Sequence, residues 1–393
     1  MVKEPKIVIV GCGVVGAVIA YELSGQLAAN IVVVDQHRPA QGATGAALGV
    51  LMGVISSKVK GRTWRLREAS IRRYSSLIAE LTAQGYTVPF NPQGIVSLCF
   101  DEAQLLRWKM LQVKRQAQGW PLEIWPTEMI QKRCPQVDIQ NTQEAQMTAV
   151  KAAIYSPADG QVHPTELTHA FIQAAAARGV TFCWQTKVTQ LTMQAQHCTG
   201  MQTSQGYLAA DWVVVAAGLG SAAITQIAHE PLALMPVLGQ AMEIQLPAAL
   251  GDENFQPVIN GNDIHLVPLG KGRYWLGATV EFPPETWAAG DILAAEAEGL
   301  IRLKKGAEQF ISAIAQAEIV KTWSGLRPRP VGQPAPVIKP LDNTDNITLA
   351  TGHYRNGVLL APATAQQICQ QLREQGVKEK TSEKYRWCQP KDS

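Results

Sequence analysis

The chain has 393 residues, of which 46% are hydrophobic and 17% are charged; 35 Lys and Arg residues against 32 Asp and Glu residues give a net charge of +3. This composition is apolar enough for a large core and too apolar for a disordered protein. At roughly 150 residues per domain, the length suggests two to three domain-sized units. So small a charge, without a clear basic stripe, argues against a protein that binds nucleic acid electrostatically.

The cysteines, the histidines and the N-terminus indicate a cytoplasmic protein without a metal site. The sequence contains no Cys-x-x-Cys pair and no His-x-His or His-Glu-x-x-His spacing. The first six residues lead directly into an apolar strand, with no signal peptide. No apolar run reaches the roughly 20 residues of a membrane-spanning helix, so we expect no transmembrane segment.

The N-terminal segment predicts a nucleotide-binding unit. A β-branched run at 6–10 ends at a Gly-x-Gly-x-x-Gly motif, residues 11–16, and a helix is expected at 17–27. A second β-branched run, 31–34, ends at Asp35. The order strand, glycine motif, helix, strand and acid is far more specific than the glycine motif alone.

Each part of this unit has its own physical role. Gly11 permits the tight turn, Gly13 lets the backbone approach a pyrophosphate, and Gly16 lets the helix pack closely on the strand. The N–H groups and partial positive charge of the helix N-terminus favour the pyrophosphate. Asp35 can accept hydrogen bonds from the adenosine ribose. The motif by itself does not distinguish NAD from FAD.

The rest of the chain alternates between strands and helices. A loop of small residues, 42–49, leaves room for backbone to lie against a flat or extended ligand. In chain order we further expect a helix at 62–84, a strand at 94–100, helices at 101–118 and 164–178, two short strands within 181–192, a strand at 211–217, short strands between 235 and 279, helices at 287–305 and 307–315, strands at 318–323 and 347–350, and a helix at 362–373. From residue 376 the chain is polar, and we expect it to be frayed.

The predicted helix at 62–84 carries a group of basic side chains. They could contact anionic lipid or a partner, so peripheral membrane contact and homo-oligomer contact both stay open, although a solvated helix face is favoured. These residues are Arg62, Arg65, Arg67, Arg72 and Arg73.

These elements imply one nucleotide-binding domain assembled from separated segments, with insertions that build a second domain containing a sheet. The chain resembles the FAD-dependent D-amino-acid oxidase superfamily, and within it the glycine oxidase and sarcosine oxidase branch, from about residue 5 to residue 372. The segments that carry the resemblance are 11–16, 42–51, 159–164, 213–221, 236–240, 267–279, 325–328 and 352–360.

The resemblance implies an α/β fold with a discontinuous Rossmann-like FAD-binding domain and a second α+β substrate domain on a mixed or antiparallel sheet. The FAD-binding domain would comprise 1–85, 151–230 and 325–375, the substrate domain 86–150 and 231–324, and the polar tail 376–393.

The resemblance also implies FAD as the cofactor. Val188 would meet the adenine through its backbone, and 353–359 would wrap the isoalloxazine end. Cys369 lies within a helix and away from an obvious attachment point, so we expect FAD to be bound non-covalently. The full set of expected FAD-binding residues is Gly11, Gly13, Val14, Val15, Gly16, Asp35, Gln36, Ala43, Thr44, Leu48, Gly49, Val50, Val188, Gly218, His353, Tyr354, Arg355, Asn356, Gly357, Val358 and Leu359.

A small-molecule amine would be oriented by its carboxylate, which a planar guanidinium can bind through two hydrogen bonds. The resemblance gives this role to Arg327 and Arg355, and Arg355 could instead serve the flavin. His265 stands where the glycine oxidase pattern has a substrate-contacting tyrosine, so it could hydrogen-bond a substrate or gate a proton; a core or surface histidine is the alternative. Leu269 replaces an arginine of that pattern and Val280 a methionine, which puts glycine in doubt as the substrate.

The expected function is therefore oxidation of the C–N bond of a small amino acid or N-methyl amine, with oxygen or another electron acceptor. The alternative is a flavin-binding assembly or interaction protein, which the changes at 265 and 269 motivate. A nicotinamide dehydrogenase is a poor third interpretation. Arg329 has no assigned role, and a surface position or an ion pair is favoured for it.

Overall fold

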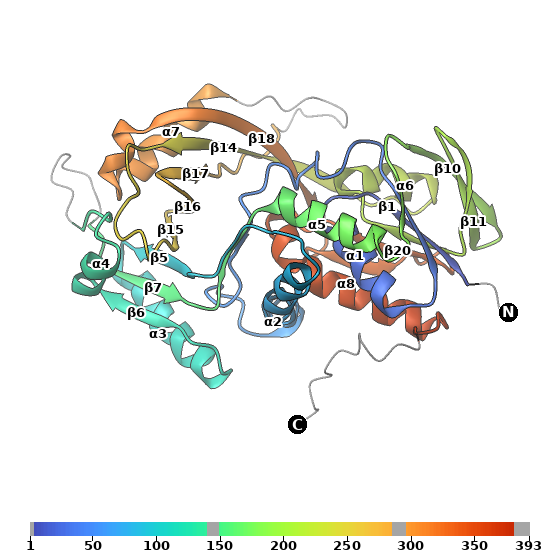
Figure 1. The fold of residues 1–393 in the computed structure, drawn as a ribbon, viewed down its shortest axis with the longest axis horizontal. Helices are drawn as coiled ribbons and strands as arrows, with labels where there is room; N and C mark the ends of the chain where they lie inside the picture. Colours follow the sequence, from blue (N-terminus) through green and yellow to red (C-terminus); the bar gives the residue numbers. More distant parts are fainter. Residues whose placement is uncertain (1–3, 140–148, 285–295, 381–393) are drawn as a thin grey trace.

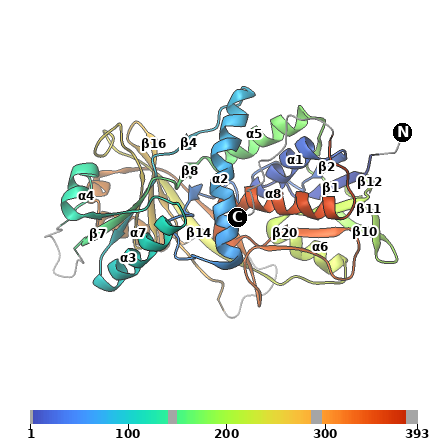
Figure 2. The ribbon, with the colours of Figure 1, turned by 90° about the horizontal axis from the view of Figure 1, so that it is seen from below.

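Two large sheets organise the molecule, which we describe from a computed structural model covering residues 4–139, 149–284 and 296–380. One sheet lies among α1, α5 and α8, and the other lies beside α3, α4 and α7 (Figure 1). Helix α2 (Gly61–Ala83) stands between these two halves in the second view (Figure 2). The predicted fold class is confirmed.

The first sheet has the strand order β19-β20-β13-β1-β2-β9. All its neighbouring pairs are parallel except the edge pair β19–β20. Such strands are covered on both faces, which explains their continuous β-branched sequences. They are β1 (Lys6–Val10), β2 (Asn30–Val34), β9 (Thr181–Cys183), β13 (Trp212–Val215), β19 (Val337–Pro340) and β20 (Ile347–Thr351).

Three helices pack together beside this sheet: α1 (Val14–Gln26), α5 (Pro164–Ala176) and α8 (Gly357–Glu374). Helix α8 begins five residues earlier than predicted and contains Pro362 in its first turns. Proline cannot donate to the carbonyl four residues before it. That carbonyl, of Val358, instead accepts a hydrogen bond from the hydroxyl of Tyr74 on α2. The proline is therefore tolerated because a distant side chain replaces its missing donor.

The second sheet is mixed, with the order β18-β14-β17-β16-β15-β5-β7-β6 and one parallel pair, β15–β5. Its two longest strands, β14 (Leu234–Gln245) and β18 (Glu318–Pro330), run beside each other over 12 and 13 residues. Both exceed the short strands predicted there. The other strands are β5 (Ile95–Cys99), β6 (Glu123–Pro126), β7 (Ala152–Ser156), β15 (Val258–Gly261), β16 (Ile264–Gly270) and β17 (Arg273–Gly277).

The helices near the second sheet are α3 (Glu102–Ala117), α4 (Thr127–Arg133), α7 (Ala297–Glu308) and the short 3-10 helix η2 (Ser312–Gln316). The predicted helix at 307–315 is wrong in its bounds, because α7 continues to Glu308 and only the η2 turn follows. The first half of the predicted helix at 287–305 falls mostly outside the described residues.

Small elements complete the fold. Two three-stranded sheets have the orders β10-β11-β12 and β3-β8-β4. Their strands are β3 (Val50–Leu51), β4 (Phe90–Asn91), β8 (Gly160–Val162), β10 (Val188–Gln194), β11 (His197–Thr203) and β12 (Gly206–Ala209). The remaining helical segments are α6 (Ser221–Ile227), η1 (Gly218–Gly220) and η3 (Tyr354–Asn356).

The predicted domain boundaries do not coincide with the sheets at two places, although the division itself stays a prediction. Strand β7 and the last residues of β18 belong to the eight-stranded sheet, whereas they were expected in the FAD-binding domain. The tail is also ordered in its first part, because Leu27 and Glu379 form a β-bridge and Val377 is buried. Residues 381–393 lie outside the described range.

The basic side chains of α2 do not form one exposed face. Arg62 donates to the Pro336 carbonyl, and Arg73 is buried between Glu22 and Glu80. The motivation for a contact with lipid through this helix is therefore weakened. Among the described helices, none combines the length and the apolar character that crossing a bilayer requires.

Candidate functional site

The glycine motif forms a turn that packs without side chains between β1 and α1. Gly11 has φ +102°, a conformation that favours glycine. A Cβ on Gly16 would lie 2.0 Å from the Gly11 carbonyl oxygen, so the helix can approach the turn only with glycine here. The structure thus gives Gly11 and Gly16 the packing roles expected from the sequence.

The N-terminus of α1 is suited to an anion. Val14 N–H donates to Thr44 Oγ1 at 3.0 Å, and a Cβ on Gly13 would lie 2.9 Å from the same oxygen. The first turn of α1 has no acidic residue, and Gly13 offers no side-chain cap. The predicted residues Gly13, Val14 and Thr44 therefore meet at a helix end whose partial positive charge is not neutralised by the helix itself.

Asp35 lies beside the same turn. Its Oδ2 accepts from Cys12 N–H at 2.7 Å and its Oδ1 from His37 N–H at 2.8 Å. Its carbonyl accepts from Thr186 N–H at 2.8 Å, which brings the segment leading to Val188 close to the end of β2. The predicted ribose and adenine contacts are thus neighbours, and Gln36 is exposed next to them.

The loop of small residues links the glycine turn to the second sheet. Trp323 Nε1 donates to the Ala46 carbonyl at 3.1 Å, and a Cβ on Gly325 would lie 2.3 Å from Ala46 Cβ. Leu48 is buried against Gly277. Of the other predicted residues, Ala43 is exposed, Gly49 is buried against β8, and Val50 begins β3.

Arg327 lies on β18, two residues beyond Gly325, and is partly buried. Its Nη1 donates to the Leu238 carbonyl at 3.0 Å, and its guanidinium covers Gly239, where a Cβ would come within 2.1 Å of Nη2. Burial lowers the pKa of Arg327, and the nearby positive charge of Arg355 lowers it further. The bare backbone at Gly239 is what makes room for this guanidinium.

Arg355 and His265 lie in the same cluster. Burial lowers the pKa of His265 to about 4, and the charges of Arg355 and then Arg327 add to that effect, while Asp263 opposes it. Arg355 Nη2 is 3.6 Å from Asp263 Oδ1, whose side chain is 77% exposed. The His265 Nδ1 atom is buried and has no hydrogen-bond partner within the described residues. The structure therefore brings together the three residues expected to bind substrate.

The segment 353–359 turns partly inward. His353 is buried, its Nε2 lies 2.8 Å from Thr364 Oγ1, and burial lowers its pKa to about 3. Tyr354 has φ +54°, and its position next to Arg355 places both at the arginine cluster. Val358 and Leu359 are buried in α8, which starts at Gly357. Gly218, with φ +58°, accepts from Thr351 through its carbonyl.

Two residues to which the sequence analysis gave no structural role organise the segment 52–58. Arg67 donates to the Met52 carbonyl at 2.6 Å and to Asn356 Oδ1 at 2.9 Å, so it joins this segment to η3. The Asp159 carboxylate accepts from Gly53, Val54 and Ile55 N–H, each at 2.8 Å. Asp159 opens one of the segments that carry the family resemblance, but nothing in the sequence indicated these contacts of Asp159 or those of Arg67.

A third residue missed in the sequence, Arg115 on α3, is fully buried. It donates to the carbonyls of Val54, Ser56 and Lys58, and its guanidinium carbon lies 3.5 Å from the Trp64 ring centre. Arg115 therefore binds carbonyl groups of the segment 52–58, whereas Asp159 binds N–H groups of the same segment. An arginine in an otherwise mixed helix gives no sequence signal for this role.

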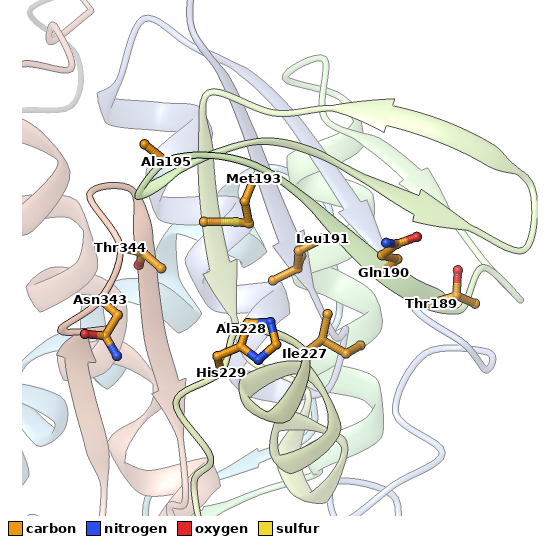
Figure 3. A pocket seen from close by; sticks show the side chains of 10 residues that line it. All are labelled: Thr189, Gln190, Leu191, Met193, Ala195, Ile227, Ala228, His229, Asn343 and Thr344. Carbon is orange, nitrogen blue, oxygen red and sulfur yellow. The ribbon is translucent and has the colours of Figure 1, made fainter.

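Two cavities among the described residues lie away from this cluster. One of about 780 Å³ is bordered by β10, the end of α6 and residues 343–344, and the side chains of His229 and Asn343 flank it (Figure 3). Another of about 460 Å³ lies between α2 and the turn at Asp159. Neither is lined by the three clustered residues, and the first has no charged residue in its lining.

The geometry of the glycine turn fits a dinucleotide cofactor. The α1 end without an acid suits a pyrophosphate, and the acidic side chain beside it suits a ribose. The loop of small residues, which leads toward the arginine cluster, leaves room for an extended ring. Cys369 is buried in α8 and its pKa is raised to about 12 by burial, so it is a poor candidate for attachment; non-covalent binding stays a prediction.

Comparisons with known proteins agree with this fold. The family described as FAD dependent oxidoreductase (DAO) matches residues 6–371. The bifunctional protein ThiO/ThiG of Synechocystis is 30% identical, over 94% of this chain and 52% of that protein. The glycine oxidase of Geobacillus kaustophilus is 27% identical over 93% of this chain and 92% of that enzyme. A solved glycine oxidase of Bacillus cereus superposes with a TM-score of 0.81 at 24% identity, over 97% of this chain and all of that one.

The chain thus belongs to the FAD dependent oxidoreductase (DAO) family, and its cofactor is FAD. It spans about half the length of the first curated relatives that it matches, the ThiO/ThiG proteins. Its likeness to glycine oxidase extends over nearly the whole of that shorter enzyme.

Proposed function

We propose that this protein oxidises the C–N bond of a small amino acid or N-methyl amine. One observation carries the proposal: unbroken contacts run from the α1 N-terminus through Thr44 and Ala46 to β18, where Arg327 lies two residues beyond Gly325. A cofactor held at the first end would extend toward a guanidinium at the other. When bound, FAD would supply the redox chemistry as the hydride acceptor for the carbon next to the amine, and water would hydrolyse the imine product.

The side chains of the cluster bind and orient the substrate. Arg327 can hold a carboxylate through two parallel hydrogen bonds. Within the described residues, its guanidinium donates one hydrogen bond, from Nη1 to the Leu238 carbonyl, so its other N–H groups are available. Arg355 adds positive charge beside it. His265 is neutral above a pKa of about 4, so its unpartnered Nδ1 can accept a hydrogen bond from the N–H of the neutral substrate amine. Fixing both ends of the substrate orients its Cα–H, which is the main contribution a protein makes to such a reaction.

The reaction yields a keto acid with ammonia or an amine, and the electrons pass to oxygen, forming hydrogen peroxide, or to another acceptor. The decisive experiment is an anaerobic titration of the yellow holoenzyme with glycine, sarcosine, proline and a panel of D-amino acids. We expect at least one of them to bleach the flavin absorption. If none of them does, the proposal of amine oxidation is wrong, and the alternative of a flavin-binding assembly protein is favoured.

A substitution at Arg327 tests the carboxylate role. Arg327→Met keeps an apolar side chain at this position of β18 but removes the guanidinium that covers Gly239, and with it the charged hydrogen bonds, which are worth about 1.5–3 kcal/mol each. We expect kcat/KM for the best substrate to fall at least roughly 10-fold, with FAD content unchanged. The matched control is Arg302→Met, on an exposed arginine of α7 that pairs with Glu298. Equal kcat/KM values in the two variants would show that Arg327 does not bind the substrate.

A further inference from the structure

The arginine cluster contains a third guanidinium that the proposed function does not use. Arg329 lies two residues beyond Arg327 on β18, so both side chains leave the same face of the strand. The guanidinium carbon of Arg329 is 5.1 Å from the ring centre of Phe282 and 5.8 Å from that of Tyr354. Tyr354 is also close enough to Arg327 to affect its pKa, so it neighbours both arginines.

Acidic side chains within the described ranges do not balance the positive charge of this group. Within the described residues, neither Arg327 nor Arg329 has a carboxylate within ion-pair distance, and Arg355 has only the long contact with exposed Asp263. The other nearby acid, Glu281, is engaged by Gln240 Nε2 at 2.9 Å and by the Thr279 hydroxyl. The three guanidinium groups thus have two described carboxylates near them, those of Asp263 and Glu281. Neither of these carboxylates neutralises Arg327 or Arg329.

The aromatic contacts give Arg329 a defined position despite its exposure. A guanidinium placed against aromatic rings is attracted by their electron-rich faces and loses less freedom when it binds an anion. Residues two apart along a strand are about 6.5 Å apart. A short linker between two carboxylates, such as –CH2–NH–CH2–, can span that order of distance.

We propose that the substrate is an amine with two carboxylates, the first bound by Arg327 with Arg355 and the second by Arg329. This inference rests on the proposed function, because it specifies the substrate class of the same site. An N-carboxymethyl amine or an acidic amino acid has the required chemistry, and an amine with a single carboxylate leaves Arg329 without its anion.

The test compares two thioethers that cannot be oxidised as amines, thiodiacetate with two carboxylates and (methylthio)acetate with one. Their dissociation constants are measured on the holoenzyme by calorimetry and by the change in flavin absorption. We expect thiodiacetate to bind at least 10-fold more tightly to the wild-type protein, and the ratio to approach one in Arg329→Gln. The preference should also weaken as salt is added, because the second carboxylate is bound near the surface.

The matched control is Arg133→Gln, on another exposed arginine that lies over two aromatic rings, at 4.2 Å from Phe255 and 5.8 Å from Trp125. It should keep the wild-type ratio. A wild-type ratio near one, or a ratio that Arg329→Gln leaves unchanged, overturns the proposal.

The corresponding amines, iminodiacetate and sarcosine, separate this inference from the proposed function. If neither they nor any other amine reduces the flavin, the proposed function fails while the thioether ratio still decides the second subsite. If sarcosine is oxidised and the thioethers bind equally, the subsite alone fails.

Discussion

The glycine turn and the arginine cluster are the two ends of one site, and they are built in different ways. The turn comes from six consecutive residues, 11–16, and its geometry depends on side chains that are absent. The cluster comes from β16, β18 and η3, which are far apart in the sequence, and its character depends on positive charges that the described acidic side chains do not fully balance. Substitutions in the glycine turn should therefore lower the retention of the cofactor. Substitutions in the arginine cluster should change substrate binding and the local charge.

The largest effect is expected where a side chain would meet backbone. In Gly16→Ala the new Cβ would lie 2.0 Å from the Gly11 carbonyl oxygen, so the turn or α1 must shift. Overpacking of this kind costs about 1–3 kcal/mol. We expect purified protein with less than about one tenth of the normal FAD and a lower melting temperature, since the displaced amides no longer converge on a pyrophosphate.

The control for this experiment is Gly42→Ala in the loop of small residues, where an added Cβ meets no atom within 4 Å. Flavin absorption relative to protein absorption measures the cofactor, and thermal unfolding measures stability. A fully yellow Gly16→Ala protein would show that the close packing of the turn on α1 is not required for FAD.

An intermediate effect is expected at Arg67, which joins the segment 52–58 to η3 beside the arginine cluster. Arg67→Met removes the hydrogen bonds to the Met52 carbonyl and to Asn356, so the segment 52–58 and η3 are no longer linked. Losing bonds to a charged group costs about 1.5–3 kcal/mol. We expect FAD to bind roughly 10-fold more weakly, with a changed visible spectrum. Arg72→Met, on the exposed neighbour paired with Glu68, should behave as wild type; equal FAD affinity in both variants would contradict the linking role.

The glycine end could be predicted from the sequence because all its determinants are local. A strand, three glycines and an acid at fixed spacing fix the turn, and the structure finds β1, α1 and β2 close to the expected bounds. The cluster residues were found only through resemblance to a family, because nothing in the spacing of His265, Arg327 and Arg355 shows that they meet.

The errors in the predicted helix and strand bounds have a common physical cause. Each of these bounds depends on a residue that is distant in the sequence. The start of α8 was missed because Pro362 was interpreted as a helix boundary, whereas Tyr74 satisfies the carbonyl that the proline cannot. The length of β14 and β18 was missed because prolines were interpreted as breaks. Pro236 and Pro328 lie opposite each other, so the two missing donors fall at the same level of the ladder.

The smallest effect is expected from the buried neutral histidine of the arginine cluster. Because the pKa of His265 is lowered to about 4 in the folded protein, from an ordinary value near 6.5, the unfolded chain binds a proton between these values while the folded one does not. Stability should therefore decline as the pH falls from about 6.5 to 4. In His265→Gln this decline should be smaller, on the order of 1 kcal/mol, as measured by denaturant unfolding at each pH. His37→Gln, on an exposed side chain, should keep the wild-type dependence, and an equally steep decline in His265→Gln would mean that this imidazole is already protonated in the folded state.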